Sequence, residues 1–205
     1  MGLSADQLRT ALDDLAAREP AFATALTRAG YPEPRIRERG YATLLRTIVG
    51  QQVSTKAAES VWRKLEGIVG PLTDPGNIAR ASDEQLREAG LSRQKASYAR
   101  SLAEEVTSGR LDLDQLPADD EDAIAALVSI KGIGRWSAEI YLLFAEGRAD
   151  IWPAGDLAVQ IEIGRILGHE ARPSEKLTRE LAEAWRPHRG AAAIFAWHHY
   201  KIEVI

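Results

Sequence analysis

The chain has 205 residues, 45% of them hydrophobic, which is enough to bury the core of a single globular domain. It carries 30 acidic and 26 basic residues, for a formal net charge of −4, and its lack of cysteine excludes disulfides, thiolate zinc sites and cysteine-held iron–sulfur clusters. No run approaches the roughly 18 apolar residues of a membrane span, and residues 1–14 lack the basic start and apolar run of a signal peptide, so we expect a cytoplasmic protein without a membrane partner.

Apolar residues repeat at helical spacing from residue 41 onward, and the first 40 residues are long enough for one or two further helices. In chain order, the predicted helices lie near residues 41–49, 58–69, 82–90, 92–109, 124–128, 136–145, 159–167 and 191–200. Gly50 is placed to end the first of these, and Ser54, Ser82 and Ser92 are suited to cap later helices. No segment alternates long enough to form a sheet, so we predict an all-α fold.

Two glycines, Gly132 and Gly134, interrupt the helical pattern between residues 124–128 and 136–145. They permit positive φ and leave backbone N–H groups uncovered at the start of a helix, where the helix dipole favours an anion. The segment therefore predicts a seat for a phosphate group. The same spacing also fits a tight turn between two helices in which the glycines serve only as caps.

The residues around these glycines carry more information than the glycines alone. The segment LVSIKGIGRWSA, residues 127–138, resembles the helix-hairpin-helix of the base-excision DNA glycosylase superfamily. In that superfamily a loop rich in glycine and proline and an essential aspartate follow the hairpin. The segment IWPAGDLAV, residues 151–159, stands at the matching distance, and Asp156 matches the aspartate.

The resemblance implies that the hairpin binds DNA. The hairpin residues assigned to this role are Lys131, Gly132, Ile133, Gly134, Arg135 and Ser137. Because the net charge of the chain is negative, DNA would also need a local basic face. Such a face could be formed by Arg93, Lys95, Arg100, Lys131 and Arg135.

Three further segments resemble the alkylbase, or 3-methyladenine, branch of the superfamily. They are IVGQQVS at residues 48–54, GLSRQK at 90–95, and WRPHR at 185–189 together with Trp197. The resemblance covers residues 41–200, without the β-rich N-terminal domain of the longer bacterial members. It implies one glycosylase domain over residues 1–205, with two helical lobes and an active site in the cleft between them. We expect one lobe near residues 41–149 and the other from residues 1–40 plus 150–205.

Removal of a base requires an anion, because the sugar becomes oxocarbenium-like as the N-glycosidic bond breaks. The resemblance assigns this role to Asp156, which is also placed to cap the helix that follows it. An aspartate at such a position more often serves only as a cap. The implied protein is a monomeric enzyme that releases alkylated bases, such as 3-methyladenine, from damaged duplex DNA, working in the cytoplasm at the bacterial nucleoid.

A base must leave the stack before it can reach the carboxylate, and a side chain must fill the gap. Gln52 matches the wedge position of the alkylbase branch, although paired glutamines in a turn are often exposed and idle. The implied base pocket comprises Trp197, Trp136, Gln51, Ile140 and Trp152. Electron-rich rings attract a cationic alkylated purine by about 0.5–2 kcal/mol, whereas tryptophans at helical spacing otherwise belong to a core.

The hairpin also indicates which product the enzyme would leave and which ion it could bind. Relatives that cut the DNA backbone carry a nucleophilic lysine where this chain has Trp136, so the resemblance implies a monofunctional enzyme that leaves an abasic site. It implies no required cofactor, but a sodium or potassium ion held by the backbone carbonyls of Val128, Ile130 and Ile133. Two alternatives stay open: a mismatch or oxidised-base glycosylase of the same superfamily, and a non-catalytic helix-hairpin-helix DNA-binding module.

Overall fold

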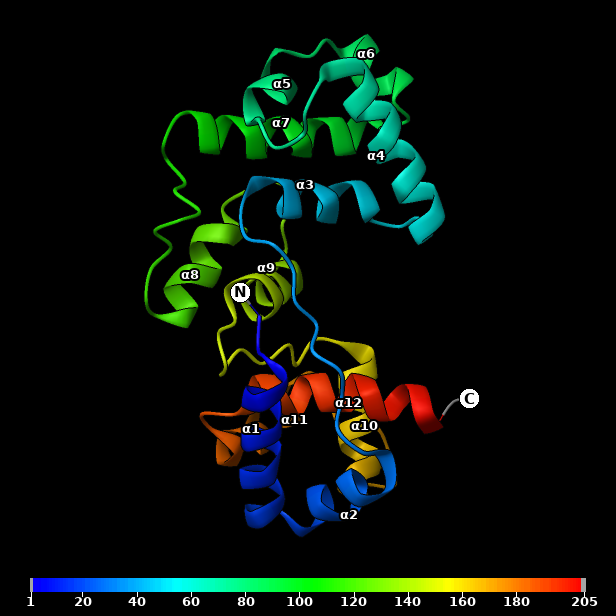
Figure 1. Cartoon of the computed structure of the whole chain (residues 1–205), viewed down its shortest axis with the longest axis vertical. Coiled ribbons are helices and arrows are strands. Elements are labelled where there is room, and N and C mark those ends of the chain that lie inside the picture. The colour runs from blue at the N-terminus through cyan, green and yellow to red at the C-terminus, as the bar shows by residue number, and fades with distance from the viewer. Residues whose placement is uncertain (1, 204–205) are drawn as a thin grey trace. The chain divides into compact units, whose positions relative to one another are not determined.

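A computed structural model describes residues 2–203, and every regular element in that range is helical (Figure 1). The predicted all-α fold is therefore confirmed. The chain divides into two compact units, which we call the hairpin unit, Glu38–Tyr141, and the terminal unit, Met1–Arg37 with Leu142–Ile205. None of the helices between residues 2 and 203 has the length and apolar character needed to cross a bilayer.

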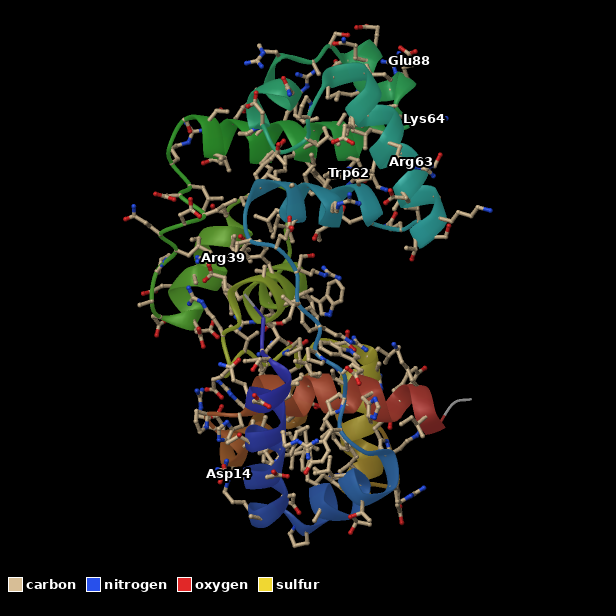
Figure 2. All side chains as sticks on the ribbon, in the orientation of Figure 1. Asp14, Arg39, Trp62, Arg63, Lys64 and Glu88 are labelled. Carbon is tan, nitrogen blue, oxygen red and sulfur yellow. The ribbon has the colours of Figure 1, made fainter. Side chains whose placement is uncertain are left out.

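The hairpin unit is built around two helices that lie side by side, α3 and α7 (Figure 1). Its helices are α3 (Tyr41–Gly50), α4 (Thr55–Val69), α5 (Pro75–Arg80), α6 (Asp83–Glu88), α7 (Arg93–Thr107), α8 (Asp120–Val128) and α9 (Arg135–Tyr141). Leu44, Ile48 and Leu102 of the central pair are fully buried. Trp62 projects from α4 toward α3, where the guanidinium carbon of Arg46 lies 3.9 Å from the centre of its ring (Figure 2).

Helix boundaries in this unit follow from local capping. Ser54, Ser82 and Ser92 each accept a hydrogen bond from the third backbone N–H of the following helix, which confirms their predicted role as N-caps. At Ser82 the side-chain oxygen of Gln85 in turn accepts a hydrogen bond from the backbone N–H of Ser82, which completes a capping box. These caps set where α4, α6 and α7 begin.

The terminal unit packs around α12, which contacts α1, α2 and α10 (Figure 1). Its elements are α1 (Ala5–Arg18), α2 (Pro20–Ala29), the π-helical turn η1 (Leu142–Glu146), α10 (Leu157–Ile166), α11 (Glu175–Ala182), the 3₁₀ turn η2 (Glu183–Trp185) and α12 (Arg189–Glu203). Phe22 lies between two aromatic neighbours, with ring centres 5.1 Å from Trp185 and 6.0 Å from Phe195. This aromatic core fixes α12 within its unit.

The unit boundaries differ from the expected lobes. The prediction placed residues 142–149 with the hairpin, whereas Leu142 begins the second part of the terminal unit. The physical reason is backbone pairing between distant parts of the terminal unit: the carbonyl of Phe144 accepts the N–H of Arg37 at 2.8 Å, and that of Ala149 accepts the N–H of Gly190 at 2.8 Å. Residues 38–40 belong to the hairpin unit instead, where the N–H of Gly40 donates to the hydroxyl of Tyr141 at 2.8 Å.

Candidate functional site

Asp156 is the N-cap of α10. Its side chain accepts a hydrogen bond from the backbone N–H of Val159 at 3.0 Å, while its own backbone is extended, with φ −73° and ψ 124°. The residues just before it, Trp152 to Ala154, are buried, so the loop that leads to the cap is anchored in the core. The predicted capping geometry is confirmed, and it holds a half-buried carboxylate at the positive end of a helix dipole.

Trp197 of α12 supplies a second donor to the same carboxylate. Its indole Nε1–H donates to Oδ1 of Asp156 at 3.1 Å, although 41 positions separate the two residues in sequence. Trp197 is only 9% exposed, and its ring lies 5.6 Å from that of Phe144 at an angle of 43°. Asp156 is therefore oriented both by its own helix and by α12. Stacking of a base on Trp197 stays a prediction.

Arg35 is a neighbour of this pair that the sequence analysis missed. Its guanidinium carbon lies over the ring of Trp197, 5.5 Å from the ring centre. Burial lowers the pKa of Arg35, and the charge of Arg37 lowers it further, while the charge of Asp156 opposes both effects. Residues 31–40 have neither apolar periodicity nor a motif, so no local signal could have connected Arg35 with the carboxylate.

Two predicted pocket residues are buried. The indole N–H of Trp152 donates to the carbonyl of Thr178 at 3.0 Å, and its ring packs edge-to-face on Trp185, with ring centres 5.5 Å apart. Trp152 is also just 4% exposed, so it packs in the core of the terminal unit, and its place in a base pocket stays a prediction. Ile140 is buried on α9 of the hairpin unit, and its pocket role stays a prediction.

The predicted hairpin is present as α8, a turn and α9. Gly132 has φ +89°, and a Cβ at this position would lie 2.2 Å from the ring of Tyr98, so the turn requires glycine for its fold. Gln51 secures the turn by donating to the carbonyl of Gly132 at 2.9 Å. Gly134 differs, because a Cβ there would meet no atom within 4 Å. The space beside its Cα, just before the start of α9, is therefore open.

A cavity of about 380 Å³ adjoins this turn within the hairpin unit. Its lining residues are Gln51, Gln52, Ser92, Gln94, Lys95, Tyr98, Gly132, Ile133 and Gly134. The cavity thus joins three segments that the sequence singled out separately, at residues 48–54, 90–95 and 131–137. Gln52, the predicted wedge, is exposed and has φ +55°, a left-handed backbone conformation that residues other than glycine rarely adopt.

The charged hairpin residues make bonds within the protein. Arg135 donates to both carboxylate oxygens of Glu121, at 2.8 and 2.5 Å, and to Glu139 at 2.9 Å. The bond to Glu121 is the main reason that the pKa of Arg135 is raised. Its guanidinium is thus paired with two carboxylates, and its contact with a DNA phosphate stays a prediction. Trp136 and Ser137 follow it on α9, and Trp136 is 46% exposed.

Part of the expected basic face forms along α7, on residues that do not line the cavity of about 380 Å³. Its centre is a groove of about 800 Å³ whose basic lining residues are Arg87, Arg93, Arg100 and Lys131, together with the acidic Asp83 and Glu104. The ammonium of Lys131 lies 3.0 Å from the hydroxyl of Ser97. Lys95 points elsewhere, because its ammonium donates to the carbonyl of Val49 at 2.8 Å.

The structure also bears on the ion expected at the hairpin. The carbonyl of Ile130 accepts the N–H of Ile133 at 3.0 Å and keeps a second lone pair. Carbonyl oxygens such as those of Val128, Ile130 and Ile133 are hard donors, which suit a sodium or potassium ion. The donor set therefore fits the expected ion. Over residues 2–203 we find no cluster of histidine and carboxylate side chains suited to a transition metal.

Comparison with known proteins identifies the family. Residues 45–187 match the model of the HhH-GPD superfamily of base excision DNA repair proteins. A putative DNA-3-methyladenine glycosylase of Bacillus subtilis is 27% identical over 77% of this chain, which spans 58% of that relative's length.

Solved structures agree with this match. A DNA-3-methyladenine glycosidase from Bacillus halodurans superposes with a TM-score of 0.86 and 32% identity, covering 92% of this chain and 88% of the other. The 3-methyladenine DNA glycosylase Mag1 of fission yeast, in complex with abasic DNA, superposes with a TM-score of 0.75 and 28% identity, covering 96% and 97%. By its residue pattern, its fold and its match over more than half its length, the chain belongs to the HhH-GPD superfamily of base excision DNA repair proteins.

Proposed function

We propose that the chain is a monofunctional DNA glycosylase that hydrolyses the N-glycosidic bond of alkylated bases, such as 3-methyladenine, in duplex DNA. The observation that carries this proposal is the carboxylate of Asp156, held by N–H groups of Val159 and Trp197. The relatives support it, since the Bacillus subtilis protein is a putative DNA-3-methyladenine glycosylase and the Bacillus halodurans structure is a DNA-3-methyladenine glycosidase.

The chemistry follows from where charge develops. As the bond between C1′ and the base nitrogen breaks, its electron pair leaves with the base and the sugar becomes oxocarbenium-like. A carboxylate close to C1′ stabilises this positive charge, and it does so best when its orientation is fixed before the reaction. The two N–H donors provide that orientation for Asp156. Water then adds to C1′ and loses a proton, which leaves an abasic site in an intact strand.

The proposed partner is damaged duplex DNA, and the hairpin unit has the features to hold it. The open space beside Gly134 leaves room for a phosphate to approach the N–H groups at the start of α9. The basic groove beside it, which includes Lys131, adds attraction that carries no sequence information. A monovalent cation on the carbonyls of Val128, Ile130 and Ile133 would add positive charge next to the same phosphate. Gln52 is the proposed wedge that replaces the extruded base.

The product distinguishes this proposal from that of a lyase. A lyase uses an amine that attacks C1′ and forms a Schiff base, and at the corresponding position this chain has Trp136, which has no nucleophile. Borohydride should therefore trap no covalent protein–DNA adduct at a rate that matches base release. An adduct formed at that rate would make Lys131, the nearest amine on the hairpin, the candidate nucleophile.

The direct test of the proposed function is base release from a panel of duplexes that each carry one defined lesion. We expect release of alkylated bases by the wild type, and none by Asp156→Asn at equal duplex binding. Release confined to oxidised or mismatched bases would instead support the alternative glycosylase of the same superfamily. Tight, salt-sensitive duplex binding without release of any base would support a non-catalytic DNA-binding module.

A further inference from the structure

The ring of Trp197 already has a cation beside it. The guanidinium carbon of Arg35 lies 5.5 Å from the ring centre, within the range of a cation–π contact. Phe144 packs on the same indole, and only 9% of Trp197 is exposed. A cationic side chain of the protein itself thus lies over the electron-rich ring that the sequence predicted for a positively charged base.

We propose that Arg35 is a specificity-determining residue of the Asp156 site, which disfavours bases with a formal positive charge relative to neutral damaged bases. This inference rests on the proposed glycosylase function and concerns how the site ranks its substrates. Because 3-methyladenine in DNA is itself cationic, Arg35 would reduce the advantage of such a base over a neutral one without excluding it. Arg35 does not touch the bond that breaks. It acts by its charge on any base that approaches Trp197.

The argument is electrostatic. A ring face that holds one cation gains less from a second, and two cations on the same ring repel each other. A base alkylated at a ring nitrogen, such as 7-methylguanine in DNA, carries a positive charge, whereas 1,N6-ethenoadenine is neutral. A cationic base leaves the sugar more readily by its own chemistry. Arg35 offsets part of that advantage, so the enzyme accelerates release of the neutral base by a larger factor than release of the cationic base.

The environment of Arg35 keeps its charge next to Trp197. A guanidinium stays protonated at neutral pH even where burial lowers its pKa, as it does here. Asp156 acts as its counter-ion and favours its charged form. The same interaction reduces the negative field that Asp156 offers to the sugar. That second effect is common to all substrates, because the oxocarbenium-like sugar is the same, so it cancels when two bases are compared.

Arg37 provides a matched control. It lies two residues further along the same segment, and its guanidinium carbon is 5.7 Å from the ring centre of Phe144. Its side chain is exposed. Arg37→Gln therefore removes one positive charge from the same segment without uncovering Trp197. Arg35→Lys is the conservative variant at the proposed position, because it retains the charge while losing the planar group.

The experiment measures single-turnover release of 7-methylguanine and of 1,N6-ethenoadenine from otherwise identical duplexes. We expect Arg35→Gln to raise the ratio of cationic to neutral release about tenfold, the size of one cation–π contact. Arg35→Lys and Arg37→Gln should keep the ratio within about twofold of the wild type, since neither removes the charge beside Trp197. Thermal unfolding and binding of undamaged duplex confirm that each variant is folded.

The outcomes separate this inference from the proposed function. A wild type that releases no damaged base refutes the function itself. A wild type that releases either base, with a ratio unchanged by Arg35→Gln, refutes only the role of Arg35. If Arg35→Gln does not fold, the wild-type rates relative to spontaneous release from the same duplexes decide the question. The role of Arg35 predicts a larger enhancement for the neutral base, and an equal or smaller one overturns it.

Discussion

Replacing Trp197 by phenylalanine tests whether its indole N–H holds the carboxylate of Asp156. The substitution keeps an aromatic ring beside Phe144 but deletes the donor that lies 3.1 Å from Oδ1. A hydrogen bond to a charged group contributes about 1.5–3 kcal/mol, so we expect the free energy of unfolding to fall by about 2 kcal/mol. Urea denaturation measures this change directly.

A double-mutant cycle with Asp156→Ala isolates the contact itself. Removal of the aspartate also costs about 1 kcal/mol for the lost cap of α10, but that loss is the same with and without the indole. We expect a coupling energy of about 1–2 kcal/mol between the two positions. A coupling below about 0.5 kcal/mol, the usual value for independent sites, would show that Trp197 does not hold the carboxylate.

The same variant should slow base release, because a carboxylate held by the N–H of Val159 alone is less firmly oriented. Small misplacements of reacting groups cost up to about 100-fold in rate, so we expect a loss of about 10- to 100-fold in single turnover. The matched control is Trp152→Phe, which deletes an indole bond to the carbonyl of Thr178 in the core of the same unit. It should lower stability without a comparable loss of release. Equal losses of activity in both variants would contradict a specific role for Trp197.

Three further predictions concern the carboxylate, the hairpin and the wedge. Asp156→Asn should slow base release by at least about 100-fold with little change in thermal stability or duplex binding, because asparagine caps helices as well as aspartate does; turnover within about tenfold of the wild type would argue against it. Gly132→Ala should unfold at lower temperature because of the clash with Tyr98, whereas Gly134→Val should fold normally and bind all duplexes more weakly in a salt titration. Gln52→Gly should stabilise the fold by about 1 kcal/mol by relieving its left-handed backbone, yet lower base release; faster release would mean that Gln52 is no wedge.

Local features of this protein were visible in its sequence. A cap joins residues three positions apart, so Ser54, Ser82 and Ser92 could be placed at helix starts from the sequence alone. The same is true of Asp156, whose bond to Val159 spans three residues. The helical hairpin was predicted for an equally local reason, because its glycines stand between two apolar periodic segments. The unit boundaries were less accurate, since they depend on backbone pairing across long stretches of chain.

Partners across the fold were decided by the tertiary structure alone. Apolar spacing indicates that Trp197 faces inward, but it does not say that its indole meets Asp156. Nothing in the loop around Trp152 says that its indole meets Thr178. A count of charges likewise cannot show that Arg135 pairs with Glu121.

The sequence by itself determined the all-helical fold, the hairpin and the capping position of Asp156, because these depend on residues within a few turns of one another. Only the tertiary structure could decide why Gly132 must be glycine, since the obstacle is the ring of Tyr98 on another helix. The contact between Arg35 and Trp197 is likewise visible only in the tertiary structure, because Arg35 lies in a segment without any periodic pattern. The physical reason is that the packing of helices determines which side chains meet. The periodicity of apolar residues indicates that a side chain is buried, but it does not indicate which side chain lies next to it.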